Sequence, residues 1–394
     1  MALLAGLMHL VPAEKVRASN LDSLYPLIGR HDSILVADAH GKVLIAKNED
    51  QKLIPASILK IFTALVALHL LGPDYRFTTE FYLDGDSNLK IKGYGDPLLI
   101  SEVVNEISQI LAARLKKSEI INDLILDKTY FKQPLTIPGI TSSPEPYDAP
   151  NGALCVNFNT VYFKRAKSGY ISAEPQTPLL PLVVQKIRRS KLNQGRIVFS
   201  HAENEITFYA GKLFQYFLEK KGITFNGKVK VGKINQTTDR LIYKYTSRYS
   251  MQQIVSKLLE FSNNFITNQL FISCGAKVYG PPGTLAKGIA AALDYAAGVL
   301  KIDDMIIFEG SGIDRKNRVS AKHMDKILDT FTPYHLLMRR EGREFFKTGT
   351  LSGINTRAGY IQNQNGELYR YAIMVNTPGK FTDAIMQKLL PALE

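Results

Sequence analysis

The hydrophobic residues near the start of the chain first alternate with polar ones and then run together. The segment SILVADAHGKVLIAKNED, residues 33–50, predicts two strands joined by a turn at His40-Gly41. From about Ala56 the pattern is apolar nearly all round a helix, until Gly72-Pro73 ends it. A helix without a polar face is typical of a domain interior, so we expect this one to be a core element.

The pattern of hydrophobic and polar residues changes over residues 76–244. Short strands are predicted at FTTEFYLDG, LILDKTYF, RIVFSH and EITFYAG, separated by loops rich in proline and glycine such as GYGDPLL and SSPEPYDAPNGAL. A basic helix, GKLFQYFLEKKG, closes the region. We therefore predict that residues 76–244 form an inserted α+β or β-rich domain.

Long helical patterns return in SMQQIVSKLLEFSNNFITNQLFISCGAKVYG and GTLAKGIAAALDYAAGVL. The chain then predicts a strand at FFKTGTL, a hairpin about Asn365-Gly366 and a final helix at FTDAIMQKLLPAL. Strands and helices thus occur at both ends of the chain. We predict one α/β domain built from residues 1–75 and 245–394 and interrupted by the insert.

The composition of the 394 residues, 45% hydrophobic and 22% charged, is typical of globular proteins. No run of about 20 apolar residues occurs, so we expect no membrane-spanning helix. The net charge of +13 suits an anionic membrane face or an acidic wall polymer, or it simply reflects a solvated surface. No basic stripe interleaved with aromatic residues and no nucleic-acid motif occurs, so no nucleic-acid partner is expected.

Two further features concern the cell compartment. The opening segment MALLAGLMHLVPAEK is apolar and then small, like the tail of a secretory signal; the alternative is a helix docked on the core. The two cysteines, Cys155 and Cys274, form no disulfide framework and no zinc motif. We expect two free, half-buried thiols and no metal.

The core helix carries a serine and a lysine three residues apart, Ser57 and Lys60. Side chains at positions i and i+3 are neighbours on a helix. A serine becomes a nucleophile when a nearby base takes its proton, and a buried lysine can be that base. Backbone N–H groups at the helix start would suit an oxyanion. The alternative is a serine near a helix cap and a lysine whose amine reaches solvent.

The spacing S-x-x-K alone is weak, because one or two copies are expected by chance in a chain of about this length. A second copy, Ser87 to Lys90, follows the turn-forming sequence DGD and has no apolar helix behind it. We therefore favour Ser57 and Lys60 over this second pair.

Two more motifs follow in the order expected of one enzyme class. Ser262-Asn263-Asn264 lies within or at the edge of a helical pattern, and Lys347-Thr348-Gly349 begins a predicted strand. The alternatives are an exposed helix turn and a strand-end turn. S-x-x-K, an S-x-N element and K-T-G together are the signature of class A β-lactamases and penicillin-binding proteins.

With these motifs the chain resembles the class C low-molecular-weight penicillin-binding proteins, the D-alanyl-D-alanine carboxypeptidase/endopeptidase family. The resemblance extends over nearly the whole chain, through GYGDPLL (93–99), YDAPNGALCVNFN (147–159), AGKLFQYFLEKKGITFNG (210–227), EGSGIDRKNRVSA (309–321) and KTGTLSGINTRAGYI (347–361). Glu309 departs from the family's usual aspartate. The segment between Phe158 and Phe208 is short, which implies an abbreviated third subdomain at about 160–205.

The resemblance implies an α/β (α+β) fold of the serine β-lactamase/transpeptidase type. Its five-stranded antiparallel sheet is flanked by helices, and a large β-rich insertion follows the S-x-x-K helix. The implied catalytic residues are Ser57 as nucleophile, Lys60 as its base, and Ser262 with Lys347 as a proton relay to the leaving amine. Asn264, Thr348, Gly349 and Thr350 are the implied substrate-binding residues. No cofactor or metal is implied.

The implied substrates are peptidoglycan stem peptides, with β-lactam antibiotics as inhibitors and the periplasm or cell envelope as the location. Peripheral membrane contact and the oligomeric state stay open. One alternative is a serine β-lactamase, which differs in the rate of acyl-enzyme breakdown. Another is a non-catalytic wall-binding protein on the same fold. A Ser-His-Asp enzyme or a zinc peptidase has little support, because neither G-x-S-x-G nor H-E-x-x-H occurs.

Overall fold

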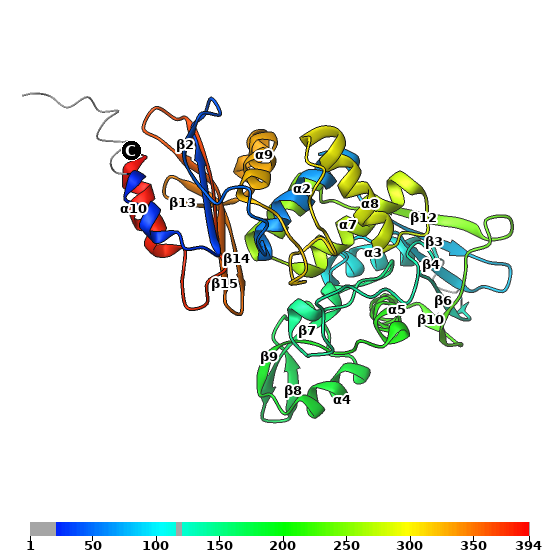
Figure 1. Ribbon diagram of the computed structural model, residues 1–394. Coiled ribbons are helices and arrows are strands. Elements are labelled where there is room, and N and C mark those ends of the chain that lie inside the picture. Colours follow the sequence, from blue (N-terminus) through cyan, green and yellow to red (C-terminus); the bar gives the residue numbers. More distant parts are fainter. Residues whose placement is uncertain (1–20, 116–119, 394) are drawn as a thin grey trace, which may run out of the picture. The chain divides into compact units, whose positions relative to one another are not determined.

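The computed structural model describes residues 21–115 and 120–393 (Figure 1). The apolar opening segment, for which a signal-like role or a docked helix was predicted, lies outside the described residues. Within the described ranges, no helix is both long and apolar enough to cross a lipid bilayer. The chain divides into two compact units: Met1–Ile61 with Asp304–Ile306 and Lys316–Glu394, and Phe62–Asp303 with Ile307–Arg315.

The first unit is built on an antiparallel sheet with the strand order β13-β14-β15-β16-β1-β2. The hairpins at His40-Gly41 and Asn365-Gly366 are confirmed. Five long strands are present as expected, and the three-residue β13 adds a short sixth strand at the edge. The strands are β1 (Asp32–Ala37), β2 (Val43–Lys47), β13 (Arg339–Glu341), β14 (Glu344–Leu351), β15 (Ile354–Gln362) and β16 (Leu368–Val375).

Helices cover both faces of this sheet (Figure 1). Helix α10 (Asp383–Ala392) shares a hydrophobic core with the sheet and with the chain around Leu21–Ile28, which includes the short turn η1 (Tyr25–Leu27). Helix α9 (Ala321–Phe331) contacts β16 and β1 and is followed by η6 (Thr332–Leu337). Strand β1 is buried along its whole length, as expected for a strand covered on both faces.

The predicted core helix begins as the short turn η2 (Ala56–Ile58) and continues as α2 (Leu59–Leu70), which ends just before Gly72-Pro73 as expected. The second unit contains α2 from Phe62 onward, α6 (Met251–Phe261), α7 (Asn264–Tyr279), α8 (Leu285–Tyr295) and the π-helical segment Ala296–Leu300. Helices α7 and α8 approach closely at Gly275 and Gly288. A Cβ atom on Gly275 would lie 2.4 Å from the backbone nitrogen of Gly288, so this packing requires glycine.

The rest of the second unit is organised around small sheets. A five-stranded sheet has the order β11-β6-β4-β3-β12, and helices α3 and α5 pack together beside it. A three-stranded sheet, β8-β7-β9, lies with α4 in the range predicted for the abbreviated third subdomain. The bounds are β3 (Thr78–Leu83), β4 (Leu89–Gly93), α3 (Ser101–Arg114), β5 (Ile120–Ile121), β6 (Leu124–Asp127), η3 (Pro146–Asp148), η4 (Asn157–Asn159), β7 (Thr160–Ala166), β8 (Gly169–Ser172), α4 (Pro181–Ser190), β9 (Gln194–Val198), α5 (Glu203–Lys220), β10 (Thr224–Phe225), β11 (Val229–Val231) and β12 (Arg240–Thr246).

One strand prediction is wrong. The segment EITFYAG, residues 205–211, belongs to the first half of α5 and is not a strand. Ile206, Tyr209, Leu213 and Phe217 are buried at helical spacing. The apolar stripe of the predicted helix 211–222 therefore extends toward the N-terminus, to Ile206. Burial of this stripe stabilises the helix more than the strand propensity of residues 205–211 favours a strand.

The compact units have other boundaries than the predicted domains. The first of the three chain stretches in the first unit ends at Ile61, inside the core helix. Helices α6 to α8, which were predicted to belong with the chain ends, are part of the second unit. The predicted insert, residues 76–244, lies wholly inside the second unit. Its status as a separate inserted domain stays a prediction.

Candidate active site

The chain directly before the predicted nucleophile is held by long-range hydrogen bonds. The backbone of Ile54 exchanges two bonds with the side-chain amide of Asn376, at 2.8 and 3.1 Å. The buried hydroxyl of Thr356 donates to the carbonyl oxygen of Pro55 at 2.7 Å. The next residue, Ala56, has a φ of +48°, a left-handed conformation that is costly for a residue with a side chain. The surrounding bonds hold this strained turn in place.

Ser57 and Lys60 face each other at the start of the core helix. The Nζ atom of Lys60 lies 2.7 Å from Ser57 Oγ, at hydrogen-bonding distance. Lys60 is fully buried and Ser57 is half-buried. A hydroxyl that reaches the surface beside a buried amine is the arrangement that activates a serine. The alternative of a lysine whose amine reaches solvent is excluded by this burial.

The K-T-G strand passes directly beside Ser57. A Cβ atom on Gly349 would lie 2.6 Å from the backbone nitrogen of Ser57, so glycine is required for the approach of β14. Thr348 and Thr350 alternate with Gly349 and are exposed, as expected of side chains on the same side of a strand. The structure thus brings Ser57, Lys60 and the strand Lys347–Thr350 together.

Lys347 is buried, and its Nζ donates to the carbonyl oxygen of Thr348 at 2.7 Å. Burial lowers the pKa of Lys347 to about 8, and the positive charge of Arg339 acts in the same direction. At neutral pH such an amine is still mostly charged, but it can lose its proton within a mildly alkaline range.

The Ser262-Asn263-Asn264 motif lies in the second unit, at the junction of α6 and α7. Ser262 ends α6 in a left-handed conformation with a φ of +53°, and the Asn263 side chain caps α7 by accepting from Ile266 N at 2.9 Å. The amide of Asn264 donates to the carbonyl oxygen of Tyr147 at 3.1 Å. The predicted Ser262 and Asn264 are half-buried at this junction, so both are partly accessible.

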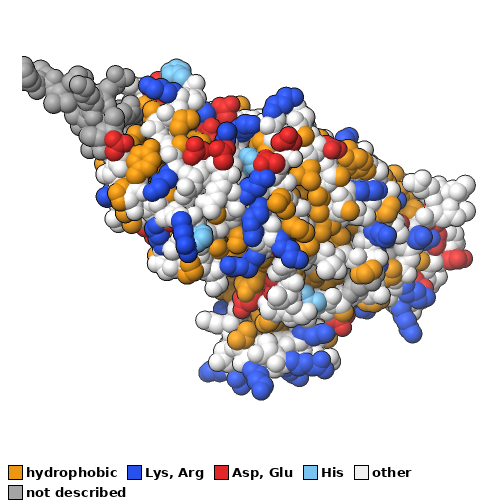
Figure 2. All heavy atoms as spheres, in the orientation of Figure 1, with side chains coloured by type: hydrophobic (Ala, Val, Ile, Leu, Met, Phe, Trp, Pro, Cys, Tyr) orange, Lys and Arg blue, Asp and Glu red, His pale blue; other side chains and the backbone are white. Residues whose placement is uncertain are grey.

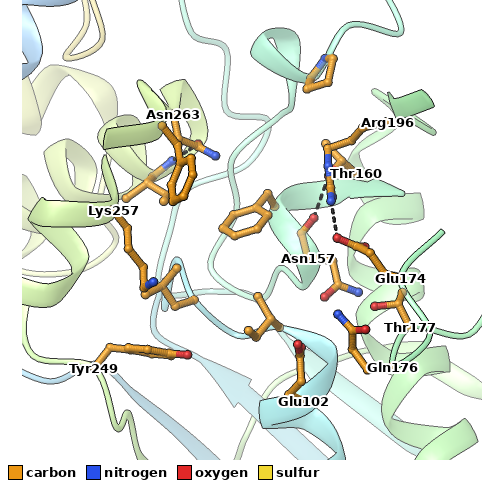
Figure 3. A pocket seen from close by; sticks show the side chains of 16 residues that line it. Glu102, Asn157, Thr160, Glu174, Gln176, Thr177, Arg196, Tyr249, Lys257 and Asn263 are labelled. Atoms are coloured by element: carbon orange, nitrogen blue, oxygen red, sulfur yellow. Dashed lines mark hydrogen bonds and ion pairs between the residues drawn. The ribbon is translucent and has the colours of Figure 1, made fainter. Parts of the chain in front are cut away.

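A cavity of about 410 Å³ opens beside this junction. Figure 3 shows Lys257 and Tyr249 on one side of it and the Arg196–Glu174 ion pair on the opposite side. Its lining mixes polar side chains such as Asn263 with the apolar Phe158, Phe261 and Ile266. A ligand in this cavity would lie against the residues that flank Ser262 and Asn264.

Phe158 reaches the cavity from a strained turn. Asn157, Phe158 and Asn159 have φ values of +50°, +58° and +54°, which is unusual for three successive residues and especially for phenylalanine. The side chains of both asparagines are buried and hydrogen-bonded, for example Asn157 Oδ1 accepting from Ser101 N at 2.8 Å. The asparagines thus hold the turn that presents Phe158.

The second S-x-x-K pair has a structural role. Ser87 lies in the turn between β3 and β4, and the Lys90 amine on β4 pairs with Asp239 at 2.9 Å and Asp84 at 3.1 Å. Burial acts to lower the pKa of Lys90, but these two carboxylates raise it above its ordinary value. A lysine held in its charged form cannot serve as a base, which agrees with our preference for Ser57 and Lys60.

The sequence reasoning missed several residues that hold the site. Asn376 and Thr356 carry no motif that would mark them as partners of the Ser57 segment. Glu309 stands out in the sequence only as a departure from the family's aspartate. It is fully buried and accepts from Ser311 N and Gly312 N at 2.6 Å each, so it organises the loop whose Gly310 carbonyl accepts from Thr63 of α2.

Neither cysteine takes part in the site. Cys155 and Cys274 are free thiols as predicted, but both are fully buried rather than half-buried, and burial raises the pKa of each to about 12. In residues 21–115 and 120–393, no three His, Cys, Asp or Glu side chains are placed to hold a metal ion.

Comparison with known proteins finds relatives that share one activity by name, D-alanyl-D-alanine carboxypeptidase. The chain is 25% identical to a D-alanyl-D-alanine carboxypeptidase of Actinomadura sp. over 418 aligned residues, covering 87% of this chain and 77% of the relative. It is 23% identical to the D-alanyl-D-alanine carboxypeptidase DacB of Haemophilus influenzae, covering 87% and 82%.

The solved structures agree on the fold. The crystal structure of penicillin binding protein 4 from Haemophilus influenzae matches with a TM-score of 0.74 at 19% identity, covering 94% of this chain and 98% of that one. A predatory endopeptidase of Bdellovibrio bacteriovorus matches with a TM-score of 0.56 at 19% identity, covering 92% of each chain. Residues 20–195 and 190–339 match one family of serine peptidases, and the chain therefore belongs to the D-Ala-D-Ala carboxypeptidase 3 (S13) family.

Proposed function

We propose that this protein cleaves the D-alanyl-D-alanine end of peptidoglycan stem peptides through an acyl-enzyme formed on Ser57. Membership of the S13 family supports the reaction class. The observation that carries the assignment of the nucleophile is the 2.7 Å contact between Lys60 Nζ and Ser57 Oγ at the edge of the K-T-G strand.

In this mechanism Ser57 Oγ attacks the carbonyl carbon of the penultimate D-alanine while Lys60 takes the hydroxyl proton. Lys60 must be neutral at that moment, and burial in apolar surroundings disfavours a charged amine. The carbonyl oxygen becomes an oxyanion, for which the N–H groups of Ser57 and Thr350 are the proposed donors. Water then hydrolyses the acyl-enzyme and regenerates the serine.

The remaining roles concern the two ends of the cleaved bond. Thr348 and Thr350, exposed beside Gly349, are proposed to bind the terminal carboxylate near the charge of Lys347. Ser262 and Lys347 are proposed to pass a proton to the leaving amine, and Asn264 to bond the amide of the substrate. Penicillin G acylates a related predatory endopeptidase of Bdellovibrio bacteriovorus, which supports β-lactams as inhibitors here.

The proposal includes export to the periplasm or cell envelope, because the substrate is found there. It also allows cleavage of D-alanine-linked cross-links, since that reaction uses the same acyl-enzyme. Both points rest on the relatives, which include carboxypeptidases and a peptidoglycan endopeptidase.

The decisive experiment is covalent labelling with benzylpenicillin followed by peptide mapping in a mass spectrometer. The adduct should lie on Ser57, and Ser57→Ala should abolish it. Ser87→Ala is the matched control and should label normally. An adduct on another residue would overturn the site assignment.

The lifetime of the benzylpenicillin adduct distinguishes a peptidase from a β-lactamase. An adduct that persists for many minutes indicates a peptidase, whereas breakdown within seconds indicates a β-lactamase. Incubation with muropeptides of known structure then shows whether D-alanine is released or cross-links are cut. Absence of both products would contradict the proposed function.

A further inference from the structure

Positive charge is concentrated in one small part of the second unit. Residues 160–198, which form β7, β8, α4 and β9, contain eight Lys or Arg residues and one acidic residue, Glu174. The resulting net charge of +7 is more than half of the +13 of the whole chain, carried by a tenth of its length. A concentration of this kind generates a local positive potential.

Six of these cations gather at one end of the three-stranded sheet, and we call them the basic tip. The hairpin between β7 and β8 and the end of α4 lie side by side there, because Arg165 N donates to Asn193 O at 2.7 Å and Lys164 is paired with Gln194 in the sheet. Figure 2 shows Lys and Arg side chains in the lowest part of the view, over these elements of Figure 1. The basic tip consists of Lys164, Arg165, Lys167, Arg188, Arg189 and Lys191.

The charges of the basic tip have no salt-bridge partners among the residues that the structure describes. Glu174 pairs with Arg196, and Lys186 pairs with Glu205 at 2.8 Å, so those two cations are excluded from the set. All six members of the basic tip are exposed, and none forms a salt bridge in the described part of the chain. Arg189 lies near enough to Glu205 to lower the pKa of that carboxyl, but the ion-pair partner of Glu205 is Lys186. The mutual repulsion of the six cations favours binding of an anionic surface.

Apolar side chains protrude among these cations. Ile171 is 43% exposed on β8 and lies directly opposite Lys164 in the sheet. Leu192 is 42% exposed and follows Lys191 at the end of α4. Exposed aliphatic side chains next to unpaired lysines and arginines are typical of surfaces that lie in the interface of a lipid bilayer.

We propose that the basic tip docks on the surface of an anionic lipid bilayer, with Ile171 and Leu192 reaching into the headgroup region. The cations supply the attraction to acidic headgroups, which acts within about a Debye length of the surface. The apolar residues favour a bilayer over a soluble polyanion, because a polymer in water offers no apolar phase to receive them.

The test is sedimentation of the full chain with vesicles of phosphatidylcholine that contain 30% phosphatidylglycerol or none. Binding should require the acidic lipid and should weaken as salt is added. The triple variant Arg188→Gln, Arg189→Gln and Lys191→Gln should bind about 100-fold more weakly, at about fivefold for each lost cation. The matched control, with the same loss of charge, is Lys42→Gln, Lys233→Gln and Lys277→Gln, three exposed lysines outside residues 160–198.

A second variant distinguishes the lipid from a polymer. Ile171→Ser with Leu192→Ser should weaken vesicle binding at least tenfold but leave binding to soluble polyphosphate unchanged. Circular dichroism melting confirms that each variant is folded. Equal vesicle binding by the triple variant and its matched control would overturn the proposal. So would vesicle binding that is unaffected by the two serine substitutions, since the surface would then recognise polyanions in general.

Discussion

Two buried lysines of the first unit differ in their hydrogen-bond partners, and we assign them different roles for that reason. Lys60 contacts the Ser57 hydroxyl, whereas Lys347 donates to the backbone of its own strand. We expect Lys60→Arg to acylate with benzylpenicillin at least 100-fold more slowly, because a guanidinium cannot give up its proton. Stopped-flow acylation rates test this. A rate close to that of the wild type would exclude Lys60 as the base.

Lys347 predicts a pH dependence of substrate binding. Its pKa of about 8 means that the charge is present at pH 7 and mostly lost at pH 9. If this charge attracts the terminal carboxylate, KM should rise roughly tenfold between these pH values. Lys347→Arg should remove that rise, because arginine stays charged throughout. A KM of the wild type that does not change from pH 7 to 9 would contradict this role.

Among the elements, the contact between β14 and the turn before α2 is the most demanding. The Cβ atom of an alanine at position 349 would lie 2.4 Å from Thr356 Oγ1 and 2.6 Å from Ser57 N. Since backbone atoms must move to admit it, we expect Gly349→Ala to reduce acylation at least 100-fold in folded protein.

The neighbouring turn of the same hairpin offers the control for this variant. Gly353 has a φ of +74°, and apart from its two chain neighbours the residue nearest to a Cβ atom there would be Pro378, at 3.4 Å. Gly353→Ala should therefore lower the melting temperature through backbone strain but leave acylation nearly unchanged. If both variants lost the same activity, the hairpin as a whole would matter rather than the approach to Ser57.

For the whole molecule, the buried Asp96 of the second unit should influence stability. Burial raises the pKa of Asp96 to about 6, while a hydrogen bond from Leu98 N opposes this shift. The folded protein therefore holds a proton between about pH 4 and 6 that the unfolded chain releases, so stability falls as pH rises through this window. The loss is complete at about pH 7, where the carboxyl is ionised in both states.

Asp96→Asn removes this titration. We expect the variant to have a higher free energy of unfolding than the wild type at pH 7, by about 2–3 kcal/mol, and a smaller advantage at pH 4. Urea unfolding at both pH values measures the difference. A variant that is less stable at pH 7 would mean that the carboxylate is held charged by the fold.

The sequence by itself determined the local elements and the identity of the candidate chemistry. Alternation and turn residues marked the hairpins at His40-Gly41 and Asn365-Gly366, and Gly72-Pro73 marked the end of the core helix. These features depend on neighbours within a few residues, and propensity and periodicity report such interactions directly. The three motifs were readable for the same reason, since each is a short local spacing.

Only the tertiary structure decided how the Ser57 segment is held. Asn376 and Thr356 lie more than 300 residues further along the chain than Ile54 and Pro55, the residues they bind. It also decided that residues 205–211 are helical, because their apolar side chains pack with the rest of α5. Contacts between distant segments follow from the packing of the whole core, which no local pattern records.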